Sequence, residues 1–179
     1  MGHMRISDAT TLLARTPTTV SALLLDLPDE WLHRDDGPDT WSAYAIAGHL
    51  LHGDETNWLP RIRLIMEHGT DRPFEPFNRV AMLSWDREPV ADLLDRFRSV
   101  RSRSLEDLDA LGLTPSDLPR SGTHPEFGTV TLSQVLSAWV AHDLTHTAQI
   151  AEVLAGRHRD DVGPYRRYMP ALDRFAPAE

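Results

Sequence analysis

The chain of 179 residues contains no cysteine and no lysine. The absence of cysteine excludes disulfide bonds, thiolate nucleophiles and zinc sites with thiolate ligands, so any metal must be held by histidine, carboxylate or water. All 18 basic residues are arginine, which we attribute to the codon usage of a GC-rich genome. A chain without cysteine is compatible with a reducing compartment, and we expect a cytoplasmic protein.

The sequence also lacks a long apolar run and an excess of positive charge. The best apolar run, Ala22 to Leu25, is far too short to span a membrane. The formal net charge is −9, and the arginines are interleaved with acidic residues. Because nucleic-acid binding needs a basic surface, we expect neither a nucleic acid nor a membrane as partner.

The length of the chain predicts a single domain. Residues 1–6 contain Met-Gly-His-Met, which is typical of a cloning remnant, and we expect a tag or a disordered terminus there. Residues 7–179 are enough for one domain with a substantial core.

Apolar residues recur at helical spacing in four long segments and predict an all-α protein. The expected helices run from about Ser7 to Leu27, Ser42 to His68, Pro89 to Leu111 and Leu132 to Ala155, with a short helix around Tyr165 to Phe175. Proline-rich and glycine-rich loops at 72–87 and 114–129 separate the last three long helices. These elements predict a four-helix bundle whose longer loops do not fit a simple up-down design.

Two prolines lie inside these helices. Pro17 is expected to kink or restart the first helix, with Thr16 as a second cap, and Pro60 is expected to bend the second. Ser7 and Thr131 are the expected N-caps of the first and last long helices.

Two histidines one helical turn apart, His142 and His146, interrupt the apolar face of the last long helix. They share a stripe with Val135 and Val153, where a buried imidazole must find a partner. Histidines at i and i+4 direct their ring nitrogens at one point, so a divalent metal is one such partner. The alternative is a pair of core imidazoles hydrogen-bonded to neighbours, because this spacing by itself is a weak motif.

The second expected helix carries another pair, His49 and His52. His49 lies off the main apolar stripe, but Gly48 and Gly53 beside it would let a neighbouring helix come close. Added to the pair on the last helix, His49 would complete a facial set of three imidazoles with open positions for water or substrate. Imidazole suits zinc, nickel and iron, so the sequence does not identify the metal.

Two stretches of the sequence resemble motifs of the DinB/YfiT-like family. In the first, Trp41 is followed eight residues later by His49, and the second runs from His142 to Ile150 as H-x-x-x-H followed by Gln-Ile. The order and spacing of the motifs fit, and with the helices they cover most of the chain. Thr147-Ala148 departs from the family, which often has Arg-Gly or Leu-Gly there, and we expect this to affect packing more than ligation.

The resemblance implies a four-helix bundle with a crossover connection and a divalent metal, commonly zinc or nickel, held by His49, His142 and His146. It gives Trp41 a structural role near the start of the second helix. Family members of known activity include S-transferases and isomerases that use low-molecular-weight thiols, and dimers are frequent. The resemblance therefore implies a metal-activated thiol that attacks a small-molecule electrophile, in a possible homodimer. The arginine-only composition favours mycothiol, a thiol of high-GC Gram-positive cells.

Two other functions stay open. One is a metal-dependent hydrolase that uses metal-bound hydroxide as nucleophile. The other is a non-enzymatic metal-binding module of a stress response.

Three further residues are candidates near the metal. His52 is a fourth ligand, a base or a surface residue, and Gln149 can bond a ligand histidine or line the pocket. Asp143 follows His142 directly, so H-D-x-x-H resembles the H-E-x-x-H of metalloproteases, in which the glutamate is the general base. Because aspartate is one methylene shorter, we expect Asp143 to face solvent or to orient a ligand from behind.

Overall fold

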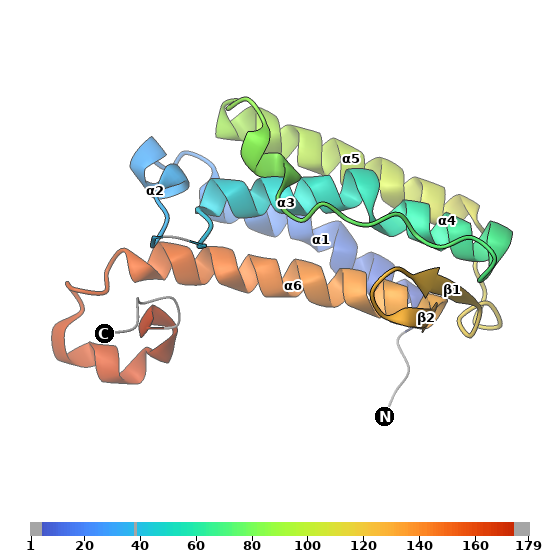
Figure 1. Ribbon diagram of the computed structural model, residues 1–179. Helices are drawn as coiled ribbons and strands as arrows, with labels where there is room; N and C mark the ends of the chain where they lie inside the picture. Colours follow the sequence, from blue (N-terminus) through green and yellow to red (C-terminus); the bar gives the residue numbers. More distant parts are fainter. Residues whose placement is uncertain (1–4, 38, 174–179) are drawn as a thin grey trace.

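Four long helices form a bundle with a small β-hairpin at one end in the computed structural model, which describes residues 5–37 and 39–173 (Figure 1). The bundle consists of α1 (Ile6–Leu24), α3 (Ala43–Thr56) continued by α4 (Trp58–His68), α5 (Val90–Ala110) and α6 (Leu132–Gly156). The smaller elements are α2 (Asp29–His33), the 3-10 helices η1 (Ala81–Ser84), η2 (Gly163–Tyr168) and η3 (Pro170–Asp173), and the strands β1 (Ser121–His124) and β2 (Gly128–Thr131). The predicted helical bundle is confirmed. None of the described helices has the length and apolarity needed to cross a membrane.

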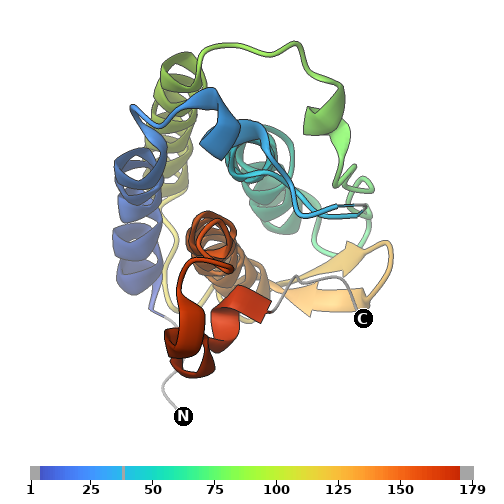
Figure 2. The same cartoon turned by 90° about the vertical axis from the view of Figure 1, so that its left-hand side faces the viewer.

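The first long helix lies across the bundle from the second, and the third lies across from the fourth. The helix α1 packs against α5 and α6, and α3 packs against the same two helices. Figure 1 shows α1 and α6 running in one direction and α3 and α5 in the other. The segment 69–89 therefore returns along the bundle from the end of α4 to the start of α5, as Figures 1 and 2 show. This segment is the crossover connection that the resemblance implied.

Pro17 does not interrupt its helix, so the predicted restart is wrong. The helix α1 is continuous from Ile6 to Leu24, with Arg5 rather than Ser7 at the N-cap. Thr16 lies buried inside the helix instead of capping it.

Pro60 does coincide with a break in the second predicted helix. Its ring nitrogen has no hydrogen to donate to the carbonyl of Thr56, and the chain leaves helical geometry at Asn57, with φ −113° and ψ −60°. At the other end, Ser42 caps α3 by accepting a hydrogen bond from the backbone N–H of Ala45. Helical hydrogen bonds cross the break, since the N–H of Asn57 donates to the carbonyl of Gly53 and that of Arg61 to the carbonyl of Asn57.

The hairpin lies inside the segment expected to be a loop. Strands β1 and β2 pair antiparallel, and the backbone N–H of Phe74 donates to the carbonyl of Thr123 at 2.9 Å. A Cβ atom at Gly122 would lie 2.8 Å from side-chain atoms of Ile65 and Phe74, so only glycine fits there. The strand β2 leads directly into α6, where Thr131 and Gln134 form the capping box that begins the helix.

The predicted tail helix is a pair of 3-10 helices, η2 and η3. Residues 174 and 175 of that prediction lie outside the described residues. The 3-10 helix η3 packs against α6.

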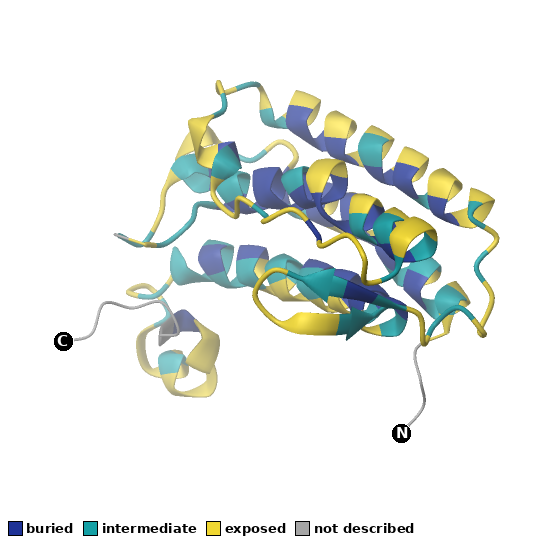
Figure 3. Ribbon diagram, turned by 45° about the vertical axis from the view of Figure 1, so that its right-hand side comes forward, coloured by how far each residue is buried: buried dark blue, intermediate teal, exposed yellow. Residues whose placement is uncertain are grey.

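The core divides into two apolar clusters, one toward each end of the bundle. One includes Leu13, Ile62 and Trp139, and the other includes Leu50 and Ile150. Figure 3 shows the buried side of each long helix turned toward the others. Between the two clusters, each long helix carries buried polar residues; these are Thr16, His49, Asp54, Arg101, Ser104 and Asp143. The interior of the bundle thus has a polar layer at mid-height.

Candidate metal centre

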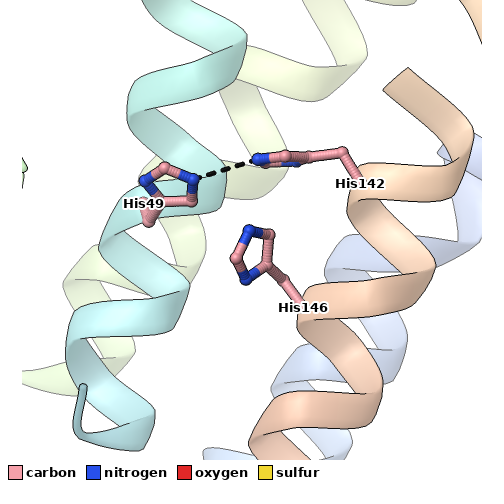
Figure 4. Close-up of side chains that lie close together, drawn as sticks. All are labelled: His49, His142 and His146. Atoms are coloured by element: carbon pink, nitrogen blue, oxygen red, sulfur yellow. Dashed lines mark hydrogen bonds between the residues drawn. The ribbon is translucent and has the colours of Figure 1, made fainter. Parts of the chain in front are cut away.

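Three histidines from two antiparallel helices meet beside this polar layer. His49 comes from α3, and His142 and His146 come from α6; Figure 4 shows their rings pointing toward one another. The Nε2 atoms of His49 and His142 lie 3.0 Å apart. One ring nitrogen from each of the three lies within 4.8 Å of the others, and no other group of three potential ligands occurs in the part of the chain described.

This spacing fits a first-row metal ion. Imidazole nitrogens bind zinc at roughly 2.0–2.1 Å, which puts neighbouring ligand nitrogens about 3 Å apart. The pair His49 and His142 already has that separation. The third ligand would be His146, whose ring nitrogen lies within 4.8 Å of the other two.

Hydrogen bonds fix the tautomers of two of these rings. The Nδ1 atom of His49 lies 3.0 Å from the carbonyl oxygen of Arg79, which can only accept, so Nδ1 carries the proton. The Nδ1 atom of His146 lies 2.8 Å from Oε1 of Gln149 and donates in the same way. In each neutral ring Nε2 then keeps its lone pair, as a metal ligand must. Gln149 lies behind His146, one of the two positions expected for it.

The third ring has a carboxylate behind it. The Nδ1 atom of His142 and Oδ1 of Asp143 are both buried without a hydrogen-bond partner, and they lie 3.9 Å apart. Asp143 is only 2% exposed, so the expectation of a solvent-facing carboxylate is wrong. Its position resembles a carboxylate–histidine–metal arrangement, in which the carboxylate orients the ligand ring.

Asp143 belongs to a buried ionic network centred on Arg101. This guanidinium of α5 donates to Asp143 Oδ2 at 2.6 Å and to Asp54 Oδ2 and Oδ1 at 2.6 and 2.9 Å. It also donates to the carbonyl of Leu13 at 2.6 Å. That carbonyl has no helical partner because Pro17, four residues later, lacks an N–H. Arg101 thereby links all four long helices and satisfies the carbonyl that Pro17 leaves free.

Burial favours the neutral form of two of the three imidazoles. Burial, helped by the nearby His142 and His146, lowers the pKa of His49 to about 3. Burial and His142 lower the pKa of His146 to about 4. Burial opposes ionisation of Asp143, but His142, Arg101 and other neighbours outweigh it and lower the pKa of that carboxyl. Neutral imidazole is the form that binds metals, so His49 and His146 are in the binding form at neutral pH.

The three histidines line a cavity of about 1030 Å³. Its walls come from α3, α4 and α6, from the crossover and from the hairpin. The ring of Trp41 lies 4.8 Å from that of His49 and stacks 6.1 Å from that of His146. Trp41 is therefore part of the cavity wall as well as a residue near the start of α3.

His52 lies outside the three-histidine group and does not line the cavity. Its Nε2 atom lies 3.1 Å from the carbonyl oxygen of Asn78, and its ring stacks on Phe77 at 5.1 Å. His52 and His49 thus bond adjacent carbonyls of the crossover. Gly53, which follows His52 on α3, allows Trp58 and His142 to come close to the helix backbone. A Cβ atom at this position would lie 3.1 Å from Trp58 Nε1.

Several residues of this site were not found from the sequence. Arg61 of α4, Phe77 of the crossover and His124 of the hairpin line the cavity, and no local pattern marks them. Arg101 did carry a signal, because it interrupts the apolar stripe of α5 that includes Leu94, Phe97 and Leu108. A charged residue at a core position requires a buried partner of opposite charge.

The fold and the site together define a helical bundle protein with a candidate three-histidine metal centre. Residues 12–150 match the DinB superfamily, and the chain belongs to that superfamily. Among solved structures it is similar to YfiT from Bacillus subtilis, with a TM-score of 0.72 and 18% sequence identity over 94% of this chain and 92% of YfiT. YfiT is described as a probable metal-dependent hydrolase with an unusual four-helix bundle topology. No curated protein matches the sequence significantly.

Proposed function

We propose that this protein is a metal-dependent enzyme whose ion, zinc or nickel, is held by His49, His142 and His146. The convergence of three imidazoles on one point of a large cavity carries the proposal. Three ligands leave coordination positions open, as in catalytic rather than structural sites. When bound, such an ion lowers the pKa of a thiol or a water molecule, so that the anion is available as nucleophile near neutral pH.

The protein's own part is to orient the ligands. The carbonyl of Arg79 and the amide of Gln149 hold two of the imidazoles in the tautomer that a metal needs. Asp143 is buried in the core and paired with Arg101, so it does not serve as a general base in the cavity. Its role is to orient His142. The ring of Trp41 contacts the imidazoles of His49 and His146 at the cavity wall.

The nucleophile we propose is a low-molecular-weight thiol, with mycothiol the first to test and a small electrophile as its reaction partner. Pockets for one small molecule span roughly 300–1,000 Å³. The cavity of about 1030 Å³ supports a site that takes a thiol and an electrophile together. The reaction would be S-transfer or a thiol-dependent isomerisation.

Hydrolysis is the second candidate, and the likeness in fold to YfiT favours it. The two functions are distinguished by whether turnover requires an added thiol. A hydrolase turns over without added thiol, whereas an S-transferase or isomerase does not.

The test begins with metal analysis of tag-free protein, together with anomalous scattering from crystals. We expect close to one zinc or nickel per chain, and an increase in melting temperature when metal is added to chelated protein. Protein that binds neither metal would contradict the proposal.

Activity is then followed as thiol consumption with an electrophile such as 1-chloro-2,4-dinitrobenzene, using mycothiol, bacillithiol and glutathione in turn. We expect metal-dependent consumption that His146→Ala abolishes. Turnover without thiol would favour the hydrolase, and tight metal binding without any turnover would favour a non-enzymatic metal-binding module. The homodimer and the cytoplasmic location stay predictions; sedimentation velocity would test the first.

A further inference from the structure

The cavity beside the three histidines differs in charge from the rest of the protein. The whole chain has a formal net charge of −9, but the acidic and arginine side chains that line the cavity are Arg61, Arg79 and Glu126. Arg79 and Glu126 pair with each other, with Nη2 and Oε2 3.3 Å apart. The charges of Arg79 and Glu126 cancel, so Arg61 gives the cavity lining a net positive charge. The rest of the protein is acidic.

The guanidinium of Arg61 has no carboxylate partner among the residues that the structure describes. It is half-buried on α4, and its Cζ atom lies 5.2 Å from the centre of the Phe74 ring. Its single hydrogen bond to described residues joins Nη2 to the carbonyl of Glu75 at 3.4 Å, and it forms no ion pair with any of them. Burial lowers the pKa of this guanidinium. A guanidinium has five N–H donors, so most of those of Arg61 are free to bind a ligand.

Arg63, on the same helix, shows the usual arrangement for a surface arginine. Its Nη2 atom lies 2.9 Å from Oδ2 of Asp107, and its side chain is 46% exposed. It does not line the cavity. The contrast shows that the missing partner of Arg61 is a property of the cavity and not of α4 as a whole.

His124 lies near Arg61, and its ring provides a second hydrogen-bond donor. Its Nδ1 atom accepts from the backbone N–H groups of Glu126 and Phe127 at 3.1 and 3.3 Å, so in the neutral ring Nε2 carries the proton. Burial, together with the charge of Arg61, lowers the pKa of His124 and favours that neutral ring. Both residues line the same cavity.

The remaining walls of the cavity are mainly apolar and aromatic. They include Trp41, Trp58, Phe77, Phe127, Val130 and Val135. Apolar walls with a few polar groups that fix orientation are typical of small-molecule sites. An arginine fork matches a planar carboxylate, to which it can donate two parallel hydrogen bonds.

We infer that Arg61, with His124 beside it, is a carboxylate-binding subsite, and that a reactant of this protein carries a carboxylate on an apolar body. The assignment of this molecule as a reactant rests on the proposed function, whereas its binding at Arg61 does not. The carboxylate can belong to the electrophile or to the thiol, because both would occupy the cavity.

The test measures binding of 2-naphthoate and its neutral isostere 2-naphthamide by isothermal titration calorimetry. Both are measured on zinc-loaded and chelator-treated protein, for wild type, Arg61→Gln and Arg63→Gln. The two substitutions each remove one positive charge from α4, but only Arg61 lines the cavity, whereas Arg63 pairs with Asp107 outside it. We expect wild type to prefer naphthoate by about tenfold or more, in both metal states. Arg63→Gln should keep this preference, and Arg61→Gln should reduce it to about twofold or less.

Three results would overturn the subsite. Equal binding of the two probes by wild type, or no binding of either at millimolar concentration, would show that the cavity does not select a carboxylate. The preference for naphthoate could also persist in Arg61→Gln and disappear when the metal is removed. That result would place the carboxylate on the metal ion, and it would support the metal centre but not this subsite. A preference that depends on Arg61 in protein unable to bind metal would support the subsite while the proposed function fails.

Discussion

The guanidinium of Arg101 lies 2.6 Å from the carboxylate of Asp143, the residue that follows His142 in the proposed ligand set. The side chains of both residues are at most 2% exposed. Arg101 also binds Asp54, so one cation pairs with two carboxylates in the middle of the bundle. The ionic network of the core and the candidate metal centre therefore meet at Asp143.

Replacing Arg101 with methionine should destabilise the protein by about 3–5 kcal/mol, because two buried carboxylates lose their counter-charge. Urea denaturation at pH 7.5 measures the change. Arg98→Met is the matched control on α5, since Arg98 is exposed and pairs only with Asp95; its effect should stay within about 0.5 kcal/mol. If Arg101→Met prevents folding, adding Asp54→Asn and Asp143→Asn should restore it. A loss below about 1 kcal/mol for Arg101→Met would contradict the role given to the network.

Asp143→Asn should weaken zinc binding by about tenfold to a hundredfold, because an amide orients the ring of His142 less strongly than a carboxylate. Asp54→Asn is the comparison, since the side chain of Asp54 bonds Arg101 and Trp139 and none of the three histidines. It should lower stability similarly while changing zinc affinity by less than about threefold. Competition with a chromophoric chelator gives both affinities. Equal losses in the two variants would mean that Asp143 acts only through stability.

His49→Ala should remove most of the bound metal, because two imidazoles hold an ion much less tightly than three. His52→Ala should leave the metal content unchanged, since its ring bonds the crossover and not the cluster. Plasma mass spectrometry of tag-free protein gives the stoichiometry of both. Loss of metal from His52→Ala would place a fourth ligand in the site.

Metal-free protein should lose stability as the pH falls below about 6.5. The pKa of His49 is lowered to about 3 and that of His146 to about 4 in the folded protein, against 6.5 for the unbound side chain. The unfolded chain therefore binds more protons between these values, and stability rises with pH across this window. His49 alone would cost about 2 kcal/mol at pH 5 relative to pH 7.5.

Chemical denaturation of chelator-treated protein at pH 5 and 7.5 measures this difference. His49→Gln, whose side chain does not titrate, should show a smaller difference. Stability that is the same at both pH values in wild type would show that protons enter the folded site easily.

The helices and the histidine pair of α6 could be predicted because their signals are local. The apolar period, the Thr131 cap and the four-residue spacing of His142 and His146 all lie within one helix. The hairpin could not be predicted in this way. Its strands have four residues each and little apolar alternation, and its position depends on the contact of Gly122 with Ile65 and Phe74.

Pro17 shows most clearly what the sequence alone determined and what the tertiary structure decided. The sequence determined that the carbonyl of Leu13 would have no helical partner, and from that local rule a kink or restart was expected. The tertiary structure supplied a donor from another helix, Arg101, which keeps α1 continuous and also holds Asp143 behind His142. In the same way, the sequence placed two imidazoles on one helical stripe, but only the packing of α3 against α6 brought His49 to them. Periodicity is a property of one helix, whereas the partner of a buried polar group depends on which helices pack together.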